Sequence, residues 1–147
     1  MPGKRVGILI EFNYEDIELW YPFYRLKEEG HESLPSAPRK GKLTTRSMDT
    51  RVRPSFRIDA LIILGGFAPD YWRRDQRILD LVREMDKARK VLASVCHEPW
   101  VLISAKVIRD RKVTCFKAII DDVYERCRKL FRRTCGCGYE YGHVKRT

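Results

Sequence analysis

Short apolar runs alternate with amphipathic segments along much of this chain, and that order constrains the fold more than any other feature. Residues 5–12, 59–66 and 91–96 form short apolar runs, which is typical of buried strands. Residues 15–30 and 75–90 follow the first two runs and carry apolar side chains at helical spacing. Strands that alternate with helices predict an α/β fold with a mostly parallel sheet.

Two further elements are expected downstream, a helix over 99–106 and a strand over 111–116. A chain of 147 residues is long enough for one domain with one core, and we find no internal repeat. No apolar run reaches the length needed to span a bilayer, and the start of the chain reads as a strand rather than a secretory signal. The five cysteines, an odd count, then favour reduced thiols and a cytoplasmic location.

The net charge of +10 is concentrated in two segments. Residues 33–57 carry seven Lys/Arg and one Asp, and residues 124–147 carry seven Lys/Arg and two Glu. The rest of the chain is nearly neutral. We therefore interpret residues 1–123 as one α/β domain that contains an atypical basic insert at 33–57, and residues 124–147 as a basic tail outside that domain.

Candidate functional groups follow three of the predicted strands. They lie between Glu11 and Asp16, at Gly65-Gly66, and at Cys96-His97. Because the carboxyl ends of parallel strands meet at one edge of a sheet, these groups are expected to converge.

Cys96 is the candidate nucleophile of this convergence. A thiol between a strand and a helix start faces unpaired N–H groups, which favour the thiolate, and a sharp turn there would expose the sulfur. Backbone N–H groups after Cys96 and near Gly65-Gly66 could hold an oxyanion, and a carboxyl from the first strand–helix junction could relay a proton. The alternative is an ordinary core cysteine, with Glu15 and Asp70 as plain surface acids.

Three motifs resemble the ThiJ/PfpI superfamily, on its PfpI-type intracellular-protease branch, which shares the class I glutamine amidotransferase-like fold. They are Glu-Asp-x-Glu-Leu from Glu15, Gly-Gly-x-x-Pro-acid from Gly65, and Ala-x-x-Cys-His-x-Pro from Ala93. The resemblance covers residues 4–32 and 58–122. It implies a flavodoxin-like three-layer α/β sandwich, assembled as dimers or hexamers.

The resemblance also implies roles for individual residues. Cys96 would be the nucleophile on an elbow and His97 the histidine that follows it. Glu15 would be the carboxyl that contacts the thiol, and Asp70 the acid that orients the histidine across a subunit interface. Independently of the resemblance, the backbone of Gly65, Gly66 and His97 is placed by the sequence to hold the oxyanion. The activities implied are peptidase, glutathione-independent glyoxalase and deglycase, each beginning with thiolate attack on a carbonyl and needing no metal or organic cofactor.

The chain departs from this pattern in several places. Glu98 stands where the family has Gly, and we expect its side chain to obstruct the pocket or shift the turn. Leu64 stands where Pro is common. We expect the basic segments 33–57 and 124–147 not to match the family at all, and the C-terminal elements of the family to be missing or replaced.

Out-of-frame translation is our hypothesis for both basic segments. Read one base later, codons for the residues from Glu125 onward permit Asn-Ala-Ala-Gly-Ser-Tyr-Ser-Asp-Glu, which is similar to the family's continuation. Codons around Met48 permit a His-Gly-Tyr turn of the kind that the family has there. A tail of this origin would pack loosely on the domain.

The tail also offers two other interpretations. Cysteines and a histidine resemble metal ligands, but their spacing matches no standard zinc pattern; they are Cys127, Cys135, Cys137 and His143. Arginines with Phe131 and Tyr139 would suit nucleic acid. Translation in a shifted frame explains the many cysteines and arginines of the tail without metal binding or nucleic-acid binding.

The sequence therefore predicts a cysteine-dependent enzyme that acts on a small carbonyl compound or a peptide, without metal or cofactor and without a membrane anchor. The family implies a homo-oligomer, although the altered tail puts the interface in doubt. A catalytically impaired remnant of the same fold is the alternative, and a basic nucleic-acid-binding module is a third, less favoured hypothesis.

Overall fold

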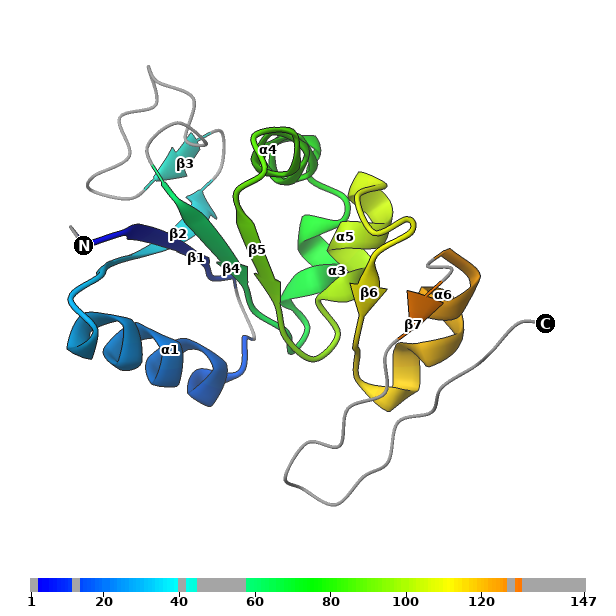
Figure 1. Ribbon diagram of the computed structural model, residues 1–147, viewed down its shortest axis with the longest axis horizontal. Coiled ribbons are helices and arrows are strands. Elements are labelled where there is room, and N and C mark those ends of the chain that lie inside the picture. The colour runs from blue at the N-terminus through cyan, green and yellow to red at the C-terminus, as the bar shows by residue number, and fades with distance from the viewer. Residues whose placement is uncertain (1–2, 12–13, 40–41, 45–57, 127–128, 131–147) are drawn as a thin grey trace.

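The computed structural model describes residues 3–11, 14–39, 42–44, 58–126 and 129–130. Five strands form one sheet in the order β3-β2-β1-β4-β5 (Figure 1). Their bounds are β1 Arg5–Leu9, β2 Glu32–Arg39, β3 Lys42–Thr44, β4 Ala60–Ile63 and β5 Val91–Ser94. β1 is parallel to β2 and β4, and β4 is parallel to β5, whereas β3 is antiparallel to β2. The predicted mostly parallel α/β fold is confirmed.

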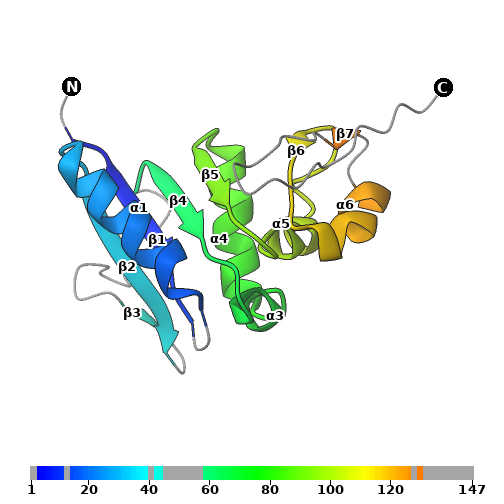
Figure 2. The same ribbon diagram turned by 90° about the horizontal axis from the view of Figure 1, so that it is seen from below.

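Helices cover both faces of this sheet. Helix α1, Asp16–Glu28, connects β1 to β2 on one face, and α4, Gln76–Lys87, connects β4 to β5 on the other (Figure 1, Figure 2). The chain thus winds outward in both directions from the central pair β1 and β4. In such sheets, the crevice at the carboxyl ends of the central strands is where ligands bind.

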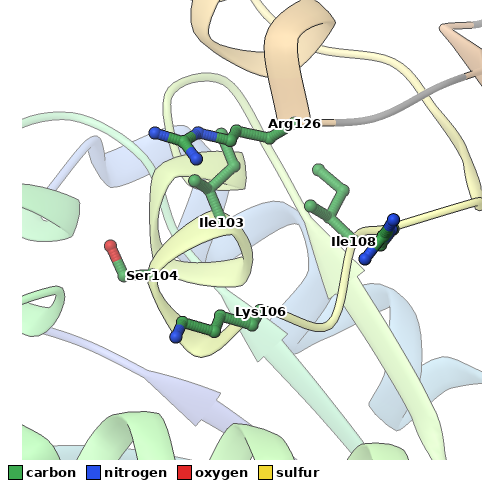
Figure 3. Close-up of a pocket in the computed structure, with 6 residues that line it drawn as sticks. Ile103, Ser104, Lys106, Ile108 and Arg126 are labelled. Atoms are coloured by element: carbon green, nitrogen blue, oxygen red, sulfur yellow. The ribbon is translucent and has the colours of Figure 1, made fainter.

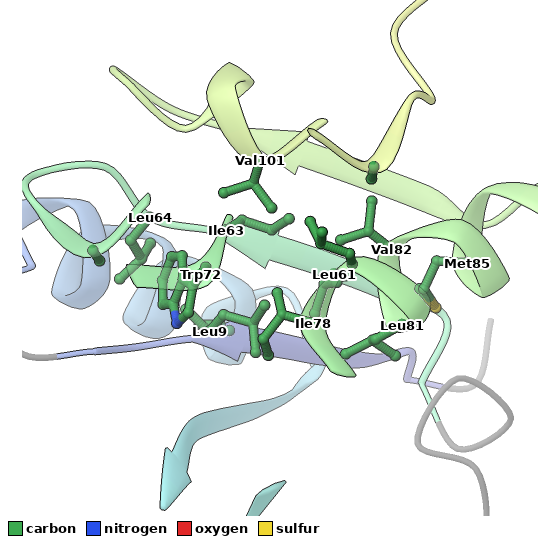
Figure 4. Packing of buried hydrophobic residues seen from close by; sticks show 14 of the residues in the cluster. Leu9, Leu61, Ile63, Leu64, Trp72, Ile78, Leu81, Val82, Met85 and Val101 are labelled. Carbon is green, nitrogen blue, oxygen red and sulfur yellow. The ribbon is translucent and has the colours of Figure 1, made fainter. Parts of the chain in front are cut away.

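The helix pattern of α4 explains how it covers the sheet. Its buried residues recur at helical spacing and face the strands, namely Ile78, Leu79, Leu81, Val82 and Met85. They pack against Leu9, Leu61 and Ile63 of the sheet and against Trp72 (Figure 4). Asp75 begins the helix by accepting a hydrogen bond from the Arg77 backbone N–H at 3.0 Å.

The remaining elements lie beyond the β5 edge. They are α3 Ala68–Trp72, α5 Pro99–Ala105, β6 Lys112–Val113, the 3-10 turn Lys117–Ile119, α6 Ile120–Arg126 and β7 Lys129–Leu130. Ile108, Ile119 and Val123 form a second small core there. The expected strand at 111–116 is present only as β6, which pairs with β7 in a separate two-stranded sheet instead of joining the main sheet.

Strand β2 was not expected from the sequence. It lies at the start of the segment 33–57, and it pairs with β1 in register from Arg5↔Glu32 to Leu9↔Ser36. Pro35, Pro38 and few β-branched residues hide it from pattern analysis. Residues 45–57 and 131–147 lie outside the described residues, so the hypothesis of out-of-frame segments stays a prediction.

Among the described helices, none is both long enough and apolar enough to cross a membrane.

Candidate active site

Cys96 occupies a strained turn between β5 and α5. Its φ of 60° places it in the left-handed region, which a residue with a side chain adopts at a cost of about 1–3 kcal/mol. The Glu98 N–H donates to the Val95 carbonyl at 3.0 Å, and the Phe116 N–H donates to the Cys96 carbonyl at 3.1 Å. Pro99, at the first turn of α5, fixes the start of the helix. The sharp elbow predicted from the sequence is therefore present at Cys96.

The carboxyl at the thiol belongs to Glu18, one turn of α1 after Glu15. The Glu18 carboxylate lies close enough to Cys96 to raise the pKa of its thiol, and its Oε2 accepts a hydrogen bond from the Gly65 N–H at 2.6 Å. The expectation that Glu15 contacts the thiol is therefore corrected. Glu15 lies just before the first residue of α1 and lines the same pocket. The sequence did contain a signal, because both acids lie in the motif that begins α1.

Backbone donors converge on the sulfur from two loops. The N–H groups of Gly66 and His97 lie near Cys96 Sγ and act to lower the pKa of its thiol. Gly65 was expected to join them, but its N–H is already bonded to Glu18. The oxyanion role expected for the two remaining donors, one after β4 and one at the start of the turn into α5, stays a prediction.

Gly65 has no room for a side chain. A Cβ at this position would lie 2.6 Å from the Cys96 Cβ and 2.9 Å from Glu18 Oε2. The close approach of β4's end to the elbow therefore requires glycine.

These residues line a pocket of about 410 Å³. Its walls come from α1, the loop after β4 and the elbow, and its lining residues are Glu15, Glu18, Gly66, Phe67, Asp70, Cys96, His97 and Trp100. The volume suits a small molecule or the side chain of a larger one. The structure thus brings together every side chain that the sequence predicted for the site, with Glu18 added.

The environment of Cys96 disfavours its thiolate. Burial raises the pKa of the thiol, and the nearby Glu18 carboxylate raises it further. Hydrogen bonds from the backbone N–H groups of Gly66 and His97 act in the opposite direction but are the smaller effect. The expectation that the helix start favours the thiolate is thus outweighed by desolvation and by a like charge.

His97 contacts the sulfur directly. Its Nδ1 lies 3.2 Å from Cys96 Sγ, and its ring packs against the rings of Phe116 and Trp100, with centroids 4.8 Å and 5.6 Å away. The Trp100 Nε1–H donates to Asp122 at 2.8 Å, which holds one of those rings in place. The imidazole is therefore fixed beside the thiol, where it can exchange a proton with it.

Asp70 lines the pocket but pairs within its own segment. Its Oδ2 lies 3.1 Å from Arg74 Nη2, and its carbonyl accepts from Arg74 Nε at 2.8 Å. A role in orienting a histidine of another subunit needs a second copy of the chain, and it stays a prediction.

Glu98 does not obstruct the pocket. Its backbone has ordinary helical dihedrals, φ −60° and ψ −28°, and its side chain is fully buried, 0% exposed, away from the pocket lining. The expectation of a blocked or shifted elbow is wrong, because the residue needs no glycine conformation and turns inward. The Ser94 hydroxyl is near, but neither carboxylate oxygen has a partner at normal hydrogen-bond geometry among the described residues. Burial consequently raises the pKa of Glu98 well above its usual range.

A metal site was not expected. Within the described part of the chain, no group of three or more His, Cys, Asp or Glu residues is arranged to hold an ion. Cys127, Cys135, Cys137 and His143 fall outside it.

Known proteins resemble this chain in sequence. A deglycase from Pyrococcus abyssi is 40% identical over 127 residues, covering 81% of this chain and 76% of the relative. The deglycase PfpI of Pyrococcus furiosus is 38% identical over 75% of this chain and 70% of its own length. The protein/nucleic acid deglycase 2 of Escherichia coli is 36% identical over 82% of this chain and 76% of its own.

Solved structures share the fold. A two-domain protein from Anabaena variabilis, with a DJ-1/ThiJ/PfpI-like and a ferritin-like domain, superposes with a TM-score of 0.75 at 30% identity. That match covers 90% of this chain and 42% of the larger protein. Drosophila melanogaster DJ-1beta superposes with a TM-score of 0.74 at 15% identity, over 91% of this chain and 78% of its own.

Residues 4–136 match the DJ-1/PfpI family. The match includes residues 33–57 and extends through 124–136, so the expectation that neither basic segment matches the family is wrong for the first segment and for the first half of the second. Together with the relatives and the shared fold, it shows that the chain belongs to the DJ-1/PfpI family.

Proposed function

We propose that this protein is a cysteine-dependent enzyme of the glyoxalase or deglycase type, in which Cys96 attacks the carbonyl carbon of a small substrate. The observation that carries the proposal is the geometry at the elbow. One sulfur in a strained turn lies against His97 Nδ1, the Glu18 carboxyl and two backbone N–H donors. The deglycase names of several relatives support the same chemistry.

The first step is addition of the Cys96 thiolate to the carbonyl carbon. A carbon–sulfur bond forms, and the electron pair of the carbonyl π bond moves to its oxygen. The N–H groups of Gly66 and His97 donate to that oxygen, since they already point at the space beside the sulfur. The proton that leaves the thiol passes to His97 Nδ1 or to Glu18, and the new alkoxide takes it up.

Weak activity at neutral pH is the expected consequence of the thiol's surroundings. Because the pKa of Cys96 is raised, only a small fraction is thiolate near pH 7. This observation also favours the second candidate, an impaired member of the family. The two candidates, an active enzyme and an impaired family member, predict different results at high pH. Ionising Cys96 should restore turnover in the active enzyme but not in the impaired member.

Methylglyoxal consumption between pH 6.5 and 9.5 tests the proposal. We expect the rate to rise with pH, to fall to background in Cys96→Ser, and to persist in the matched variant Cys115→Ser. A fluorogenic peptide assayed in parallel separates peptidase activity. A rate that survives in Cys96→Ser would refute the proposal. If Cys96 is alkylated readily at high pH while no carbonyl compound or peptide is turned over, the impaired remnant is the correct reading.

A further inference from the structure

A second pocket lies at the far end of α5 from Cys96. It has a volume of about 520 Å³ and is lined by Ile103, Ser104, Lys106, Ile108, Arg109 and Arg126 (Figure 3). It draws on three parts of the chain, because α5 and the turn after it meet the last residue of α6 here. None of these residues belongs to the pocket at Cys96.

The charge of this pocket is one-sided. Three of its six lining residues are cations, and no acid among the described residues lines it. Arg109 forms an ion pair with Asp110 at 3.9 Å. Both side chains are exposed to solvent, so the pair neutralises little of the positive charge of the pocket. A fourth cation lies beside the wall, since Arg73 Nε donates to Ser104 Oγ at 3.3 Å. Cations gathered in a concave site attract an anion more strongly than the same charges on a flat surface.

The rest of the lining is apolar. Ile108 is buried in the small core with Ile119 and Val123, and Ile103 packs against the same core. Ile103 and Ile108 therefore offer a fixed apolar wall beside the cations (Figure 3). The volume falls in the range of about 300–1,000 Å³ that small-molecule sites occupy, more space than a single inorganic ion fills.

We propose that this pocket binds a nucleotide-sized organic phosphate. The phosphate groups lie between Lys106 and Arg126, on either side of Ser104 (Figure 3), and the apolar part of the ligand lies against Ile103 and Ile108. Arginine and lysine are the side chains that recognise phosphate, by paired hydrogen bonds and by charge. The proposal concerns binding at a separate site, and it does not depend on the chemistry at Cys96.

Calorimetric titration of the full chain with ATP, adenosine and a single-stranded 12-mer oligonucleotide tests it. We expect ATP to bind, adenosine not to bind, and Lys106→Gln and Arg126→Gln each to weaken ATP binding by about tenfold or more, the effect of losing one charged hydrogen bond. Arg89→Gln is the matched control for Lys106→Gln. Both residues are exposed cations with positive φ, 54° and 62°, and Arg89 lies outside the pocket.

Amide chemical shifts of the unmodified protein provide a second test, which does not depend on whether the variants fold. Adding ATP to the unmodified protein should shift the amides of Ile103 and Ser104 more than those around Arg89. Binding that is equally weakened by Arg89→Gln, or that occurs with the oligonucleotide but not with ATP, would overturn the proposal in favour of diffuse attraction to a basic surface. If pyrophosphate binds as tightly as ATP, the proposed contact between the ligand and the apolar wall of Ile103 and Ile108 would be overturned.

Discussion

The Glu18 carboxylate accepts a hydrogen bond from the Gly65 backbone N–H at 2.6 Å, and this contact joins the first turn of α1 to the loop after β4. It also sets the electrostatics of the site. One carboxylate is held against the Cys96 thiol, whose pKa it raises, and one backbone donor is removed from the group that could stabilise an oxyanion. Burial of Cys96 adds to the same shift in pKa.

Alkylation of Cys96 should therefore depend on pH in a way that Glu18 controls. We expect the rate with iodoacetamide to rise through a midpoint above the usual thiol range. In Glu18→Gln the midpoint should fall, because the negative charge that opposes ionisation is gone. Mass spectrometry of the labelled Cys96 peptide measures the rate at each pH.

Glu28→Gln is the control, since Glu28 is an exposed acid at the other end of α1. A midpoint that stays the same in Glu18→Gln would mean that Glu18 does not influence the ionisation of Cys96. A midpoint that rises would mean that Glu18 stabilises the thiolate by donating a hydrogen bond to it.

Gly65→Ala should disrupt the site. Its new Cβ would meet the Cys96 Cβ at 2.6 Å and the Val95 carbonyl oxygen at 3.1 Å, so the elbow must move. We expect a loss of stability of about 1–3 kcal/mol, the usual cost of overpacking, together with loss of any activity that depends on Cys96.

Chemical denaturation and the methylglyoxal assay measure both effects. Gly7→Ala is the comparison, because the tight contacts of its Cβ would be with the ends of the Ile58 and Leu61 side chains, at 3.1 Å and 3.3 Å, while the nearest backbone atom, the Ala60 carbonyl oxygen, is 3.8 Å away. Equal effects of the two variants would show that the elbow tolerates displacement.

Glu98→Met should stabilise the protein at alkaline pH. The folded-state pKa of Glu98 is raised by burial, so the folded protein holds a proton that the unfolded chain releases. Stability is therefore highest below the unfolded pKa of about 4.5 and is lost as the pH rises toward the folded value. Removing the carboxyl should raise the free energy of unfolding at pH 8 by roughly 2 kcal/mol, with the gain shrinking as the pH falls toward 4.

Denaturation curves at several pH values check this, with the exposed Glu125→Gln as control. A gain in stability that is independent of pH would mean that Glu98 has the same pKa in the folded and unfolded states. Since Glu98 lies outside the pocket, we expect any turnover per folded molecule to stay unchanged.

The edge of the sheet at β5 should bind hydrophobic dye. Within the described sheet β5 is an edge strand, with Val91 63% exposed and Val95, just after it, 40% exposed. Exposed apolar edges favour association. Val91→Lys should reduce dye fluorescence and self-association, measured by sedimentation.

Ile17→Lys is the control that distinguishes the β5 edge from the exposed apolar face of α1. Ile17 lies on α1 and is exposed to a similar extent, 69%. If Ile17→Lys has the larger effect, the α1 face rather than the β5 edge drives association.

The sequence by itself determined the layout of the fold and the position of the nucleophile. The runs at β1, β4 and β5 are apolar over short lengths, and α4 repeats its buried residues every three or four positions, so local pattern was sufficient to place them. Cys96 could be found because it lies where a strand ends and a helix begins. The strand β2 could not be found, because its two prolines and sparse apolar residues become a strand only by pairing with β1.

Tertiary structure alone decided which groups act on the thiol. Glu15 and Glu18 are both acids at the start of α1, and only the packing of α1 against the loop after β4 selects Glu18. The same packing uses the Gly65 N–H and leaves those of Gly66 and His97. Glu98 looked like an obstruction in the sequence, yet its helical dihedrals turn it into the core. How deeply a side chain is buried, and which groups lie next to it, depend on segments that are far apart in the chain. The pattern of neighbouring residues in the sequence therefore cannot predict either.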